Sequence, residues 1–167
     1  EDIKYAIWET QWLNEFSQHQ TSNQMIVVEV EKEFVDSLYY YLNDNLRMDF
    51  FLNPDEKEIQ FYISESNVPV IIKRLVTRAP IQKIKNKKAV VPIATLEKIM
   101  VDLFADETLL HFYQGSEMVN IYEKIIDRYS INFTKLFSYA KRRKKEQEIK
   151  QFISNNIPNF LEDIKYD

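Results

Sequence analysis

The amino-acid sequence predicts an α/β fold, with a mixed β-sheet and packed helices in the N-terminal half and a mostly helical C-terminal half. Before Val76, short β-branched runs alternate with amphipathic segments, which is typical of strands interleaved with helices. After Pro92, apolar residues recur at the three- and four-residue spacing of helices. Of the 167 residues, 45% are hydrophobic and 14% aromatic, which is enough to fill a core.

We expect one domain over residues 1–167. Within it, a sheet-containing half (4–76) and a helical half (95–155) are joined by a basic connector (77–94), and a tail (156–167) follows.

The sheet-containing half predicts the element order β-α-β-α-β-β-β. In chain order we expect a strand at 4–9, a helix at 11–20 capped by Thr10, a strand at 25–30, a helix at 32–44, two strands at 48–53 and 58–64 around a turn at 54–57, and a strand at 68–76. The inward-facing residues of the two helices are predicted to be Trp12, Leu13 and Phe16 in the first, and Phe34, Leu38, Tyr41 and Leu42 in the second. Pro69 suits the start of a strand or an edge strand.

The helical half predicts a helix at 94–110 with Thr95 as N-cap, a helix at 116–129, and a third that begins near Asn132 and continues, after a break, over 146–156. Pro158 is expected to end the last one. The predicted inward faces comprise Leu96, Ile99, Met100, Leu103 and Phe104 in the first helix, and Val119, Tyr122, Ile126 and Tyr129 in the second.

Gly115 is the only glycine of the chain. It follows one predicted helix and precedes Ser116, a residue type that favours the N-cap. Glycine adopts positive φ at little cost, so we expect Gly115 to make a tight reversal between two helices, with Ser116 capping the second.

Composition excludes several classes of site. The chain has no cysteine, so disulfides, thiolate zinc sites and cysteine nucleophiles are absent. His19 and His111 have no second ligand at helical or strand spacing, and no serine is flanked by the glycines of a nucleophile elbow. No apolar run approaches the roughly 20 residues of a membrane span. We expect a cytoplasmic protein with no membrane contact, cofactor, metal or evident small-molecule substrate.

The best candidates for catalysis are carboxylates. Glu29 and Glu31 alternate along one predicted strand and so point to the same side. With Asp36 or Asp49 they could hold a divalent cation, as in metal-dependent nucleases. Residues 55–57, Asp-Glu-Lys, match the end of a common nuclease signature.

A simpler interpretation of these carboxylates is favoured. Val28 and Val30 take the core face of the strand, which leaves Glu29 and Glu31 in solvent, and residues 55–57 fall in a predicted turn. The chain is therefore expected to be non-catalytic, with a metal-dependent nuclease as the alternative.

Charge is distributed unevenly along this acidic chain, whose net charge is −4. Residues 66–96 contain seven basic residues and no acid, and residues 141–145 add five more basic residues. Such segments suit phosphate backbones or an acidic protein partner. The predicted nucleic-acid or partner-binding residues are Arg74, Arg78, Lys83, Lys85, Lys87, Lys88, Lys141, Arg142 and Arg143. The first six are expected on one strand and the loop after it.

Three segments carry a resemblance to a known family: "VVPIATLEKIMVDLFAD", "FYQGSEM" and "INFTKLFSYAKRR". They resemble the C-terminal domain of AbiEi-type proteins, the antitoxin and transcriptional-regulator half of type IV toxin–antitoxin systems, and more closely a related uncharacterised bacterial group. The segment from Tyr5 to Leu42 fits that group as well, so the resemblance covers about Tyr5 to Phe152.

The resemblance implies an α/β domain that counteracts a nucleotidyltransferase-type toxin. It also implies an N-terminal winged-helix domain that binds DNA, which we expect in a longer protein because no such segment precedes Tyr5 here. A cognate toxin and DNA are thus the expected partners. The chain departs from the family pattern at Lys144, near which a helix-ending glycine is expected.

Overall fold

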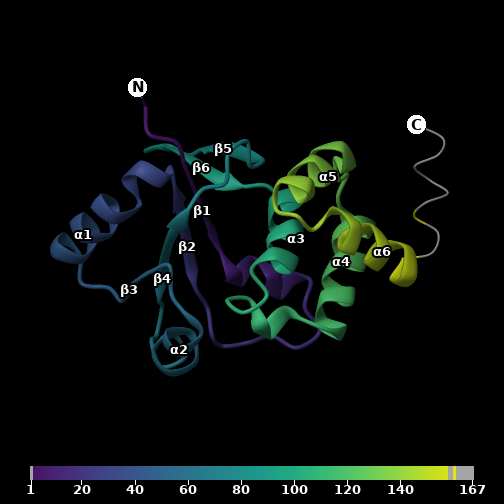
Figure 1. The fold of residues 1–167 in the computed structure, drawn as a ribbon, viewed down its shortest axis with the longest axis horizontal. Coiled ribbons are helices and arrows are strands. Elements are labelled where there is room, and N and C mark those ends of the chain that lie inside the picture. The colour runs from purple at the N-terminus through teal and green to yellow at the C-terminus, as the bar shows by residue number, and fades with distance from the viewer. Residues whose placement is uncertain (1, 158–159, 161–167) are drawn as a thin grey trace. The chain divides into compact units, whose positions relative to one another are not determined.

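The computed structural model describes residues 2–157 and 160, and the chain divides into two compact units. The first unit comprises Glu1–Glu15 and His19–Thr95, and the second comprises Phe16–Gln18 and Leu96–Asp167. A mixed six-stranded sheet lies in the first unit and the helices from α3 onward lie in the second, which confirms the predicted α/β class (Figure 1).

The sheet has the strand order β3-β4-β2-β1-β6-β5. Its strands are β1 (Tyr5–Glu9), β2 (Ile26–Val30), β3 (Phe50–Leu52), β4 (Val70–Arg74), β5 (Ile81–Lys85) and β6 (Val90–Ala94). Strands β3, β4 and β2 are mutually parallel, β1 is antiparallel to β2 and parallel to β6, and β5 is antiparallel to β6. The predicted strands at 4–9, 25–30, 48–53 and 68–76 are confirmed. Pro69 precedes β4, which is an interior strand.

Helix α1 (Val35–Asn45), preceded by a 3-10 turn (Lys32–Phe34), packs on one face of this sheet. The predicted helix is confirmed, and so are Leu38 and Leu42 of its predicted inward face. Phe34 and Tyr41 are exposed, the latter by 65%. The cluster on this face comprises Val28, Val30, Val35, Phe50, Val70 and Ile72, with Leu38, Tyr39 and Leu42 of α1 packed against it.

The segment 58–64 was predicted as a strand, and this prediction is wrong. It belongs to α2 (Glu56–Glu58) and a π-helix (Ile59–Ile63). The side chain of Asp55 accepts a hydrogen bond from the Glu58 backbone N–H at 2.8 Å, which caps the helix. Ile59 and Ile63 are buried one turn apart. Capping by Asp55 thus prevails over the alternation of apolar residues.

Two further corrections concern the first unit. The predicted helix at 11–20 is a shorter 3-10 helix (Thr10–Glu15), and the Thr10 hydroxyl accepts a hydrogen bond from the Met25 backbone N–H at 2.9 Å. Trp12, expected inward, is exposed by 37%. The predicted connector 77–94 is not a loop, because β5 and β6 complete the sheet within it.

The second unit contains α3 (Leu96–Ala105), a 3-10 turn (His111–Tyr113), α4 (Ser116–Arg128), α5 (Phe133–Arg142) and α6 (Glu146–Asn156). Its buried side chains include Phe16, Ile99, Met100, Leu103, Ile121, Tyr122, Ile125, Leu136, Tyr139, Ile149 and Ile153. Of the predicted inward residues of α4, Tyr122 is confirmed as buried, whereas Tyr129 is exposed. The other buried positions include Met118, Ile121 and Ile125, each one residue before a predicted or confirmed one.

Gly115 has φ +63°, which confirms the predicted positive φ. It occupies the N-cap position of α4, and Ser116 is the first helical residue. The prediction that the Ser116 side chain caps this helix is therefore wrong. A Cβ at Gly115 would meet nothing within 4 Å, so the backbone conformation alone requires glycine there.

The predicted break between α5 and α6 is confirmed. The predicted start of α5 near Asn132 is confirmed as well. The Asn132 side chain caps the helix by accepting a hydrogen bond from the Lys135 backbone N–H at 3.0 Å. Lys144 takes φ +58°, the conformation for which a glycine was expected. Pro158, the predicted end of α6, lies outside the described residues.

Candidate nucleic-acid interface

Strands β5 and β6 form a hairpin at the edge of the sheet, and we call residues 81–94 the basic hairpin. Asn86 shapes its turn. The backbone N–H of Asn86 donates to the carbonyl of Ala89 at 3.0 Å, and the Asn86 side chain accepts from the N–H groups of Lys88 and Ala89 at 2.9 and 2.8 Å. This turn places Lys87 and Lys88 at the exposed tip of the hairpin.

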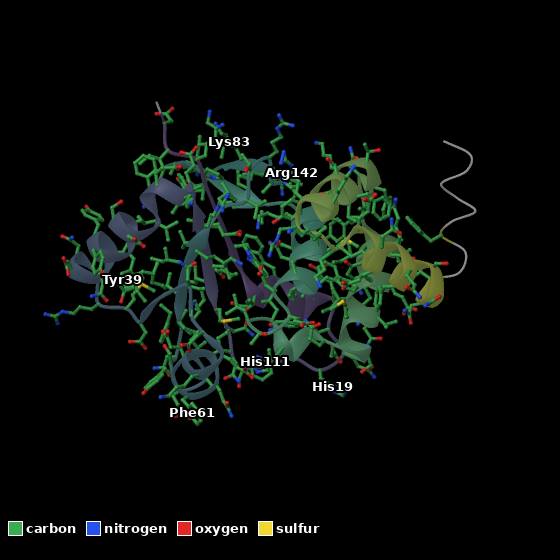
Figure 2. All side chains as sticks on the ribbon, viewed as in Figure 1. His19, Tyr39, Phe61, Lys83, His111 and Arg142 are labelled. Carbon is green, nitrogen blue, oxygen red and sulfur yellow. The ribbon has the colours of Figure 1, made fainter. Side chains whose placement is uncertain are left out.

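Lys83 and Lys85 alternate along β5 and so point to the same face of the hairpin. Both are exposed, and Figure 2 shows Lys83 pointing away from the sheet. Within the described residues, none of the predicted basic side chains of the first unit makes an ion pair; these are Arg74, Arg78, Lys83, Lys85, Lys87 and Lys88.

The strand register brings further basic residues to the same end of the sheet. Tyr5 pairs with Val30, which pairs with Arg74, so Arg74 and the start of β1 are level. Because Ile7 pairs with Ile93 in parallel strands, Lys4 is level with Val90, near the hairpin tip. The sequence had not singled out Lys4. It was missed because its position depends on pairing between strands far apart in the chain.

The acid Glu31, which directly follows β2, also lies at this end. The Glu31 carboxylate accepts a hydrogen bond from the Lys4 backbone N–H at 3.2 Å, which engages part of its charge. Arg78, on the segment between β4 and β5, has φ +59° and is exposed. The first unit thus presents an array of basic side chains along one end and one edge of its sheet.

The basic residues of the second predicted block, 141–145, differ in exposure and in ion pairing. Lys141 and Arg142 are exposed, and Figure 2 shows Arg142 directed into solvent. Arg143 is not, since its side chain is only 13% exposed and pairs with Asp102 and Asp106. Lys145 pairs with Glu148 at 3.1 Å. The ion pairs of Arg143 within the fold therefore argue against the predicted binding of a partner by this residue.

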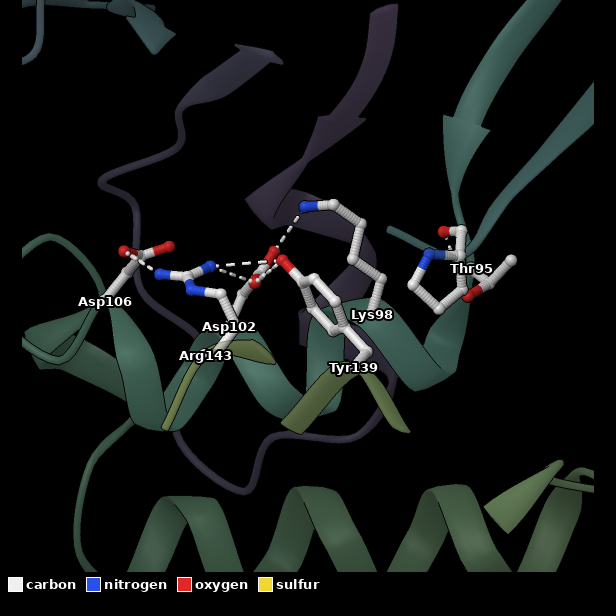
Figure 3. Close-up of polar contacts among 7 residues, drawn as sticks. Thr95, Lys98, Asp102, Asp106, Tyr139 and Arg143 are labelled. Carbon is white, nitrogen blue, oxygen red and sulfur yellow. Dashed lines mark hydrogen bonds and ion pairs between the residues drawn. The ribbon is translucent and has the colours of Figure 1, made fainter. Parts of the chain in front are cut away.

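Arg143 belongs to a buried ionic network in the second unit (Figure 3). Asp102 on α3 is its centre. One carboxylate oxygen of Asp102 accepts from Lys98 Nζ at 2.5 Å, and the other accepts from the Tyr139 hydroxyl and from Arg143 Nη1, both at 2.7 Å. The other guanidinium nitrogen, Nη2, donates to Asp106 at 2.8 Å.

Burial and charge act in opposite directions on this network. Burial alone would lower the pKa of Arg143, but the carboxylates of Asp102 and Asp106 and the Tyr139 hydroxyl outweigh it and raise that pKa above its ordinary value. Burial, with the Asp102 charge adding to it, also raises the pKa of Tyr122, whose hydroxyl donates to the Met100 carbonyl at 2.6 Å. Arg143 therefore stays charged and Tyr122 stays protonated.

Sequence reasoning missed Lys98 and Asp102, both of which are buried. A signal was present, because opposite charges four residues apart stand in a helix that is otherwise apolar around most of its circumference. Such a pair is normally solvent-exposed, so its burial does not follow from the sequence alone.

The carboxylates of the nuclease alternative do not converge. Glu29, expected in solvent, is 1% exposed, because the central strand β2 is covered on both faces. Phe50 pairs with Val70 while Glu29 pairs with Lys73, so Asp49 lies toward the opposite end of the parallel strands. The Asp49 carboxylate accepts from the Ser66 hydroxyl. Among the described residues, no group of three or more histidine or acidic side chains could hold a metal ion.

Comparison with protein families gives one match. Residues 1–159 match the profile of a family of unknown function, DUF6577. The chain belongs to this family. Comparison with curated proteins and with solved structures finds no match. In the part of the chain that the structure describes, no helix is both long and apolar enough to cross a bilayer.

Proposed function

We propose that this DUF6577 chain is a non-catalytic interaction domain of an AbiEi-like antitoxin and transcriptional regulator in the cytoplasm, and that its basic hairpin binds the backbone of nucleic acid. The observation that carries the proposal is the hairpin itself. Four exposed lysines gather on one strand and its turn, and residues 66–96 contribute no acid to neutralise them.

The chemistry of these side chains favours phosphate over bases. Lysine is a compact point charge on a flexible stem, so it attracts phosphate without the planar fork that reads a base edge. Release of counterions from nucleic acid then supplies most of the binding free energy, and this contribution does not depend on sequence. The hairpin is therefore proposed as a backbone clamp.

A salt titration of binding to non-specific duplex DNA tests the proposal. The wild-type chain should bind at low salt, with a log–log slope of about −0.9 for each phosphate neutralised. The double variant Lys85→Glu, Lys87→Glu should bind more weakly to all sequences alike, with a slope reduced in magnitude by about 2.

The matched control is Lys57→Glu. Lys57 is exposed in the same unit but lies between the acids Glu56 and Glu58 on α2, so its reversal should leave binding unchanged. If the wild type does not bind at low salt, or if the double variant matches it, the nucleic-acid role is wrong. An acidic surface of a partner protein, such as a cognate nucleotidyltransferase-type toxin, would then be the occupant of the hairpin.

A further inference from the structure

We infer that the exposed face of α5 enters the major groove of duplex DNA and reads base pairs there. This inference rests on the proposed function, to which it adds the sequence-selective element. It starts from composition: residues 128–145 contain seven basic residues and no acid, a second acid-free stretch in an acidic chain.

All exposed positions of α5 carry a hydroxyl or a positive charge. Thr134, Ser138 and Arg142 recur four residues apart and so form one stripe along the helix. Lys135 and Lys141 flank this stripe, one on each side, because each residue turns the helix by about 100°. We call these five residues the α5 stripe. It contains no acid and no apolar side chain.

The stripe has the hydrogen-bonding groups that base edges require. Arginine reads guanine through two hydrogen bonds, serine and threonine hydroxyls contact several base edges, and flanking lysines reach phosphates. Within the described residues, no hydrogen bond or ion pair engages the side chains of Thr134, Lys135, Ser138 or Arg142. Lys141 is attracted to Glu146. The stripe is therefore largely available to a partner.

The opposite face of α5 fixes the rotation of the helix. Leu136, Tyr139 and Ala140 are buried, and α5 packs against α3. The Tyr139 hydroxyl bonds to Asp102, and Arg143, one residue beyond the stripe, is held by Asp102 and Asp106. Packing and the buried network together hold the stripe outward, and such preorganisation is what precise recognition needs.

Groove dimensions select the type of nucleic acid. A helix of ten residues is about 15 Å long, and the major groove of B-DNA, about 12 Å wide, admits an α-helix. The deep and narrow major groove of an RNA duplex does not admit side chains in this way. Duplex DNA is thus the partner that fits the α5 stripe.

The test is selection of the full chain against a pool of duplexes with a randomised segment. Wild type should enrich a short motif. The variant Arg142→Lys keeps the charge but loses the planar fork, so it should lower the preference for that motif over a shuffled duplex about 5-fold or more and leave the salt slope unchanged. Arg128→Lys, the same substitution on α4 outside the stripe, is the control and should leave the preference unchanged.

The outcomes separate this inference from the proposed function. If the wild type binds DNA in a salt-dependent way but enriches no motif, the α5 stripe does not read bases, and the backbone clamp stands. An Arg142→Lys variant with wild-type preference likewise overturns the inference. If no duplex binds at low salt, both proposals are wrong. Arg142 is exposed, so its replacement should leave the thermal midpoint within the range of the control variant.

Discussion

The two basic segments of this chain differ in how far acidic side chains engage them. In the basic hairpin, Lys83, Lys85, Lys87 and Lys88 are all exposed and make no ion pair within the described residues. In the block 141–145, basic side chains are partly engaged by acids of the same unit. A run of basic residues in a sequence therefore does not by itself specify a binding surface. Acidic side chains that the fold brings close decide which of these charges remain available to a partner.

The two segments differ in exposure because they lie on different kinds of secondary structure. An edge strand and its turn expose their side chains, so lysines there pay no desolvation cost. Arg143, which follows helix α5 where it packs against α3, is instead largely buried, and a buried charge requires a partner of opposite sign. Arg143 finds two, Asp102 and Asp106.

The largest effect on stability is expected from disrupting the buried ionic network around Asp102. Asp102→Ala removes the carboxylate that Lys98, Tyr139 and Arg143 share. Removal of one partner from a buried ionic network typically costs about 3–5 kcal/mol, because it leaves buried charge uncompensated. Urea denaturation should therefore show a large loss in the free energy of unfolding.

The control for this variant is Glu148→Ala. It removes the partner of Lys145 from an ion pair in which Glu148 is more than half exposed, and exposed pairs contribute about 0–1 kcal/mol. If the two variants lose similar stability, the network around Asp102 is not the stabilising feature that its geometry indicates.

A smaller loss is expected at Gly115. Its φ of +63° and ψ of −130° disfavour residues with a side chain, and strained backbone of this kind costs of order 1–3 kcal/mol. Gly115→Ala should lower the free energy of unfolding by that amount, while Ser116→Ala, which removes no capping bond, should change it by less than about 0.5 kcal/mol. The reverse ranking would restore Ser116 as the cap of α4.

The sequence predicted the elements that local rules determine. Strand β1 was predicted from alternation, and β2 and β4 from β-branched runs. The start of α5 was predicted near Asn132, whose side chain caps this helix. The π-helix 59–63 was missed because its apolar residues alternate as in a strand.

Other features could not be read from the chain. The inward faces of α1 and α4 were only partly predicted: Leu38, Leu42 and Tyr122 pack inward as expected, but Tyr41 and Tyr129 are exposed. Apolar residues stand on both sides of each boundary, so the sequence pattern does not locate it. The role of Arg143 depends on Asp102, which lies 41 residues away in sequence. The exposed lysines of the basic hairpin were predicted as candidates, but their strand and its neighbours emerged only from the sheet register.

A gain in stability is expected at Lys144. The residue holds φ +58°, and a left-handed conformation costs a residue with a side chain about 1–2 kcal/mol. Glycine avoids that cost but loses more entropy on folding, so Lys144→Gly should stabilise the chain by about 1 kcal/mol or less. The check is the urea midpoint, with Lys141→Gly, in the regular part of α5, as a control that should be destabilising. A destabilised Lys144→Gly variant would show that the lysine side chain itself supports the break.

The smallest effect on stability is expected from the exposed lysines of the basic hairpin. Lys87→Gln with Lys88→Gln removes two charges that have no ion-pair partner in the described part of the chain, so the free energy of unfolding should change by less than about 0.5 kcal/mol. Asn86→Ala is the positive control, because it deletes two hydrogen bonds of the same turn, each typically worth about 0.5–1.5 kcal/mol. A stability loss in the lysine variant equal to that of the control would mean that these charges serve the fold. An unchanged free energy of unfolding would mean that these charges are available to a partner, which is the property that the proposed backbone clamp requires.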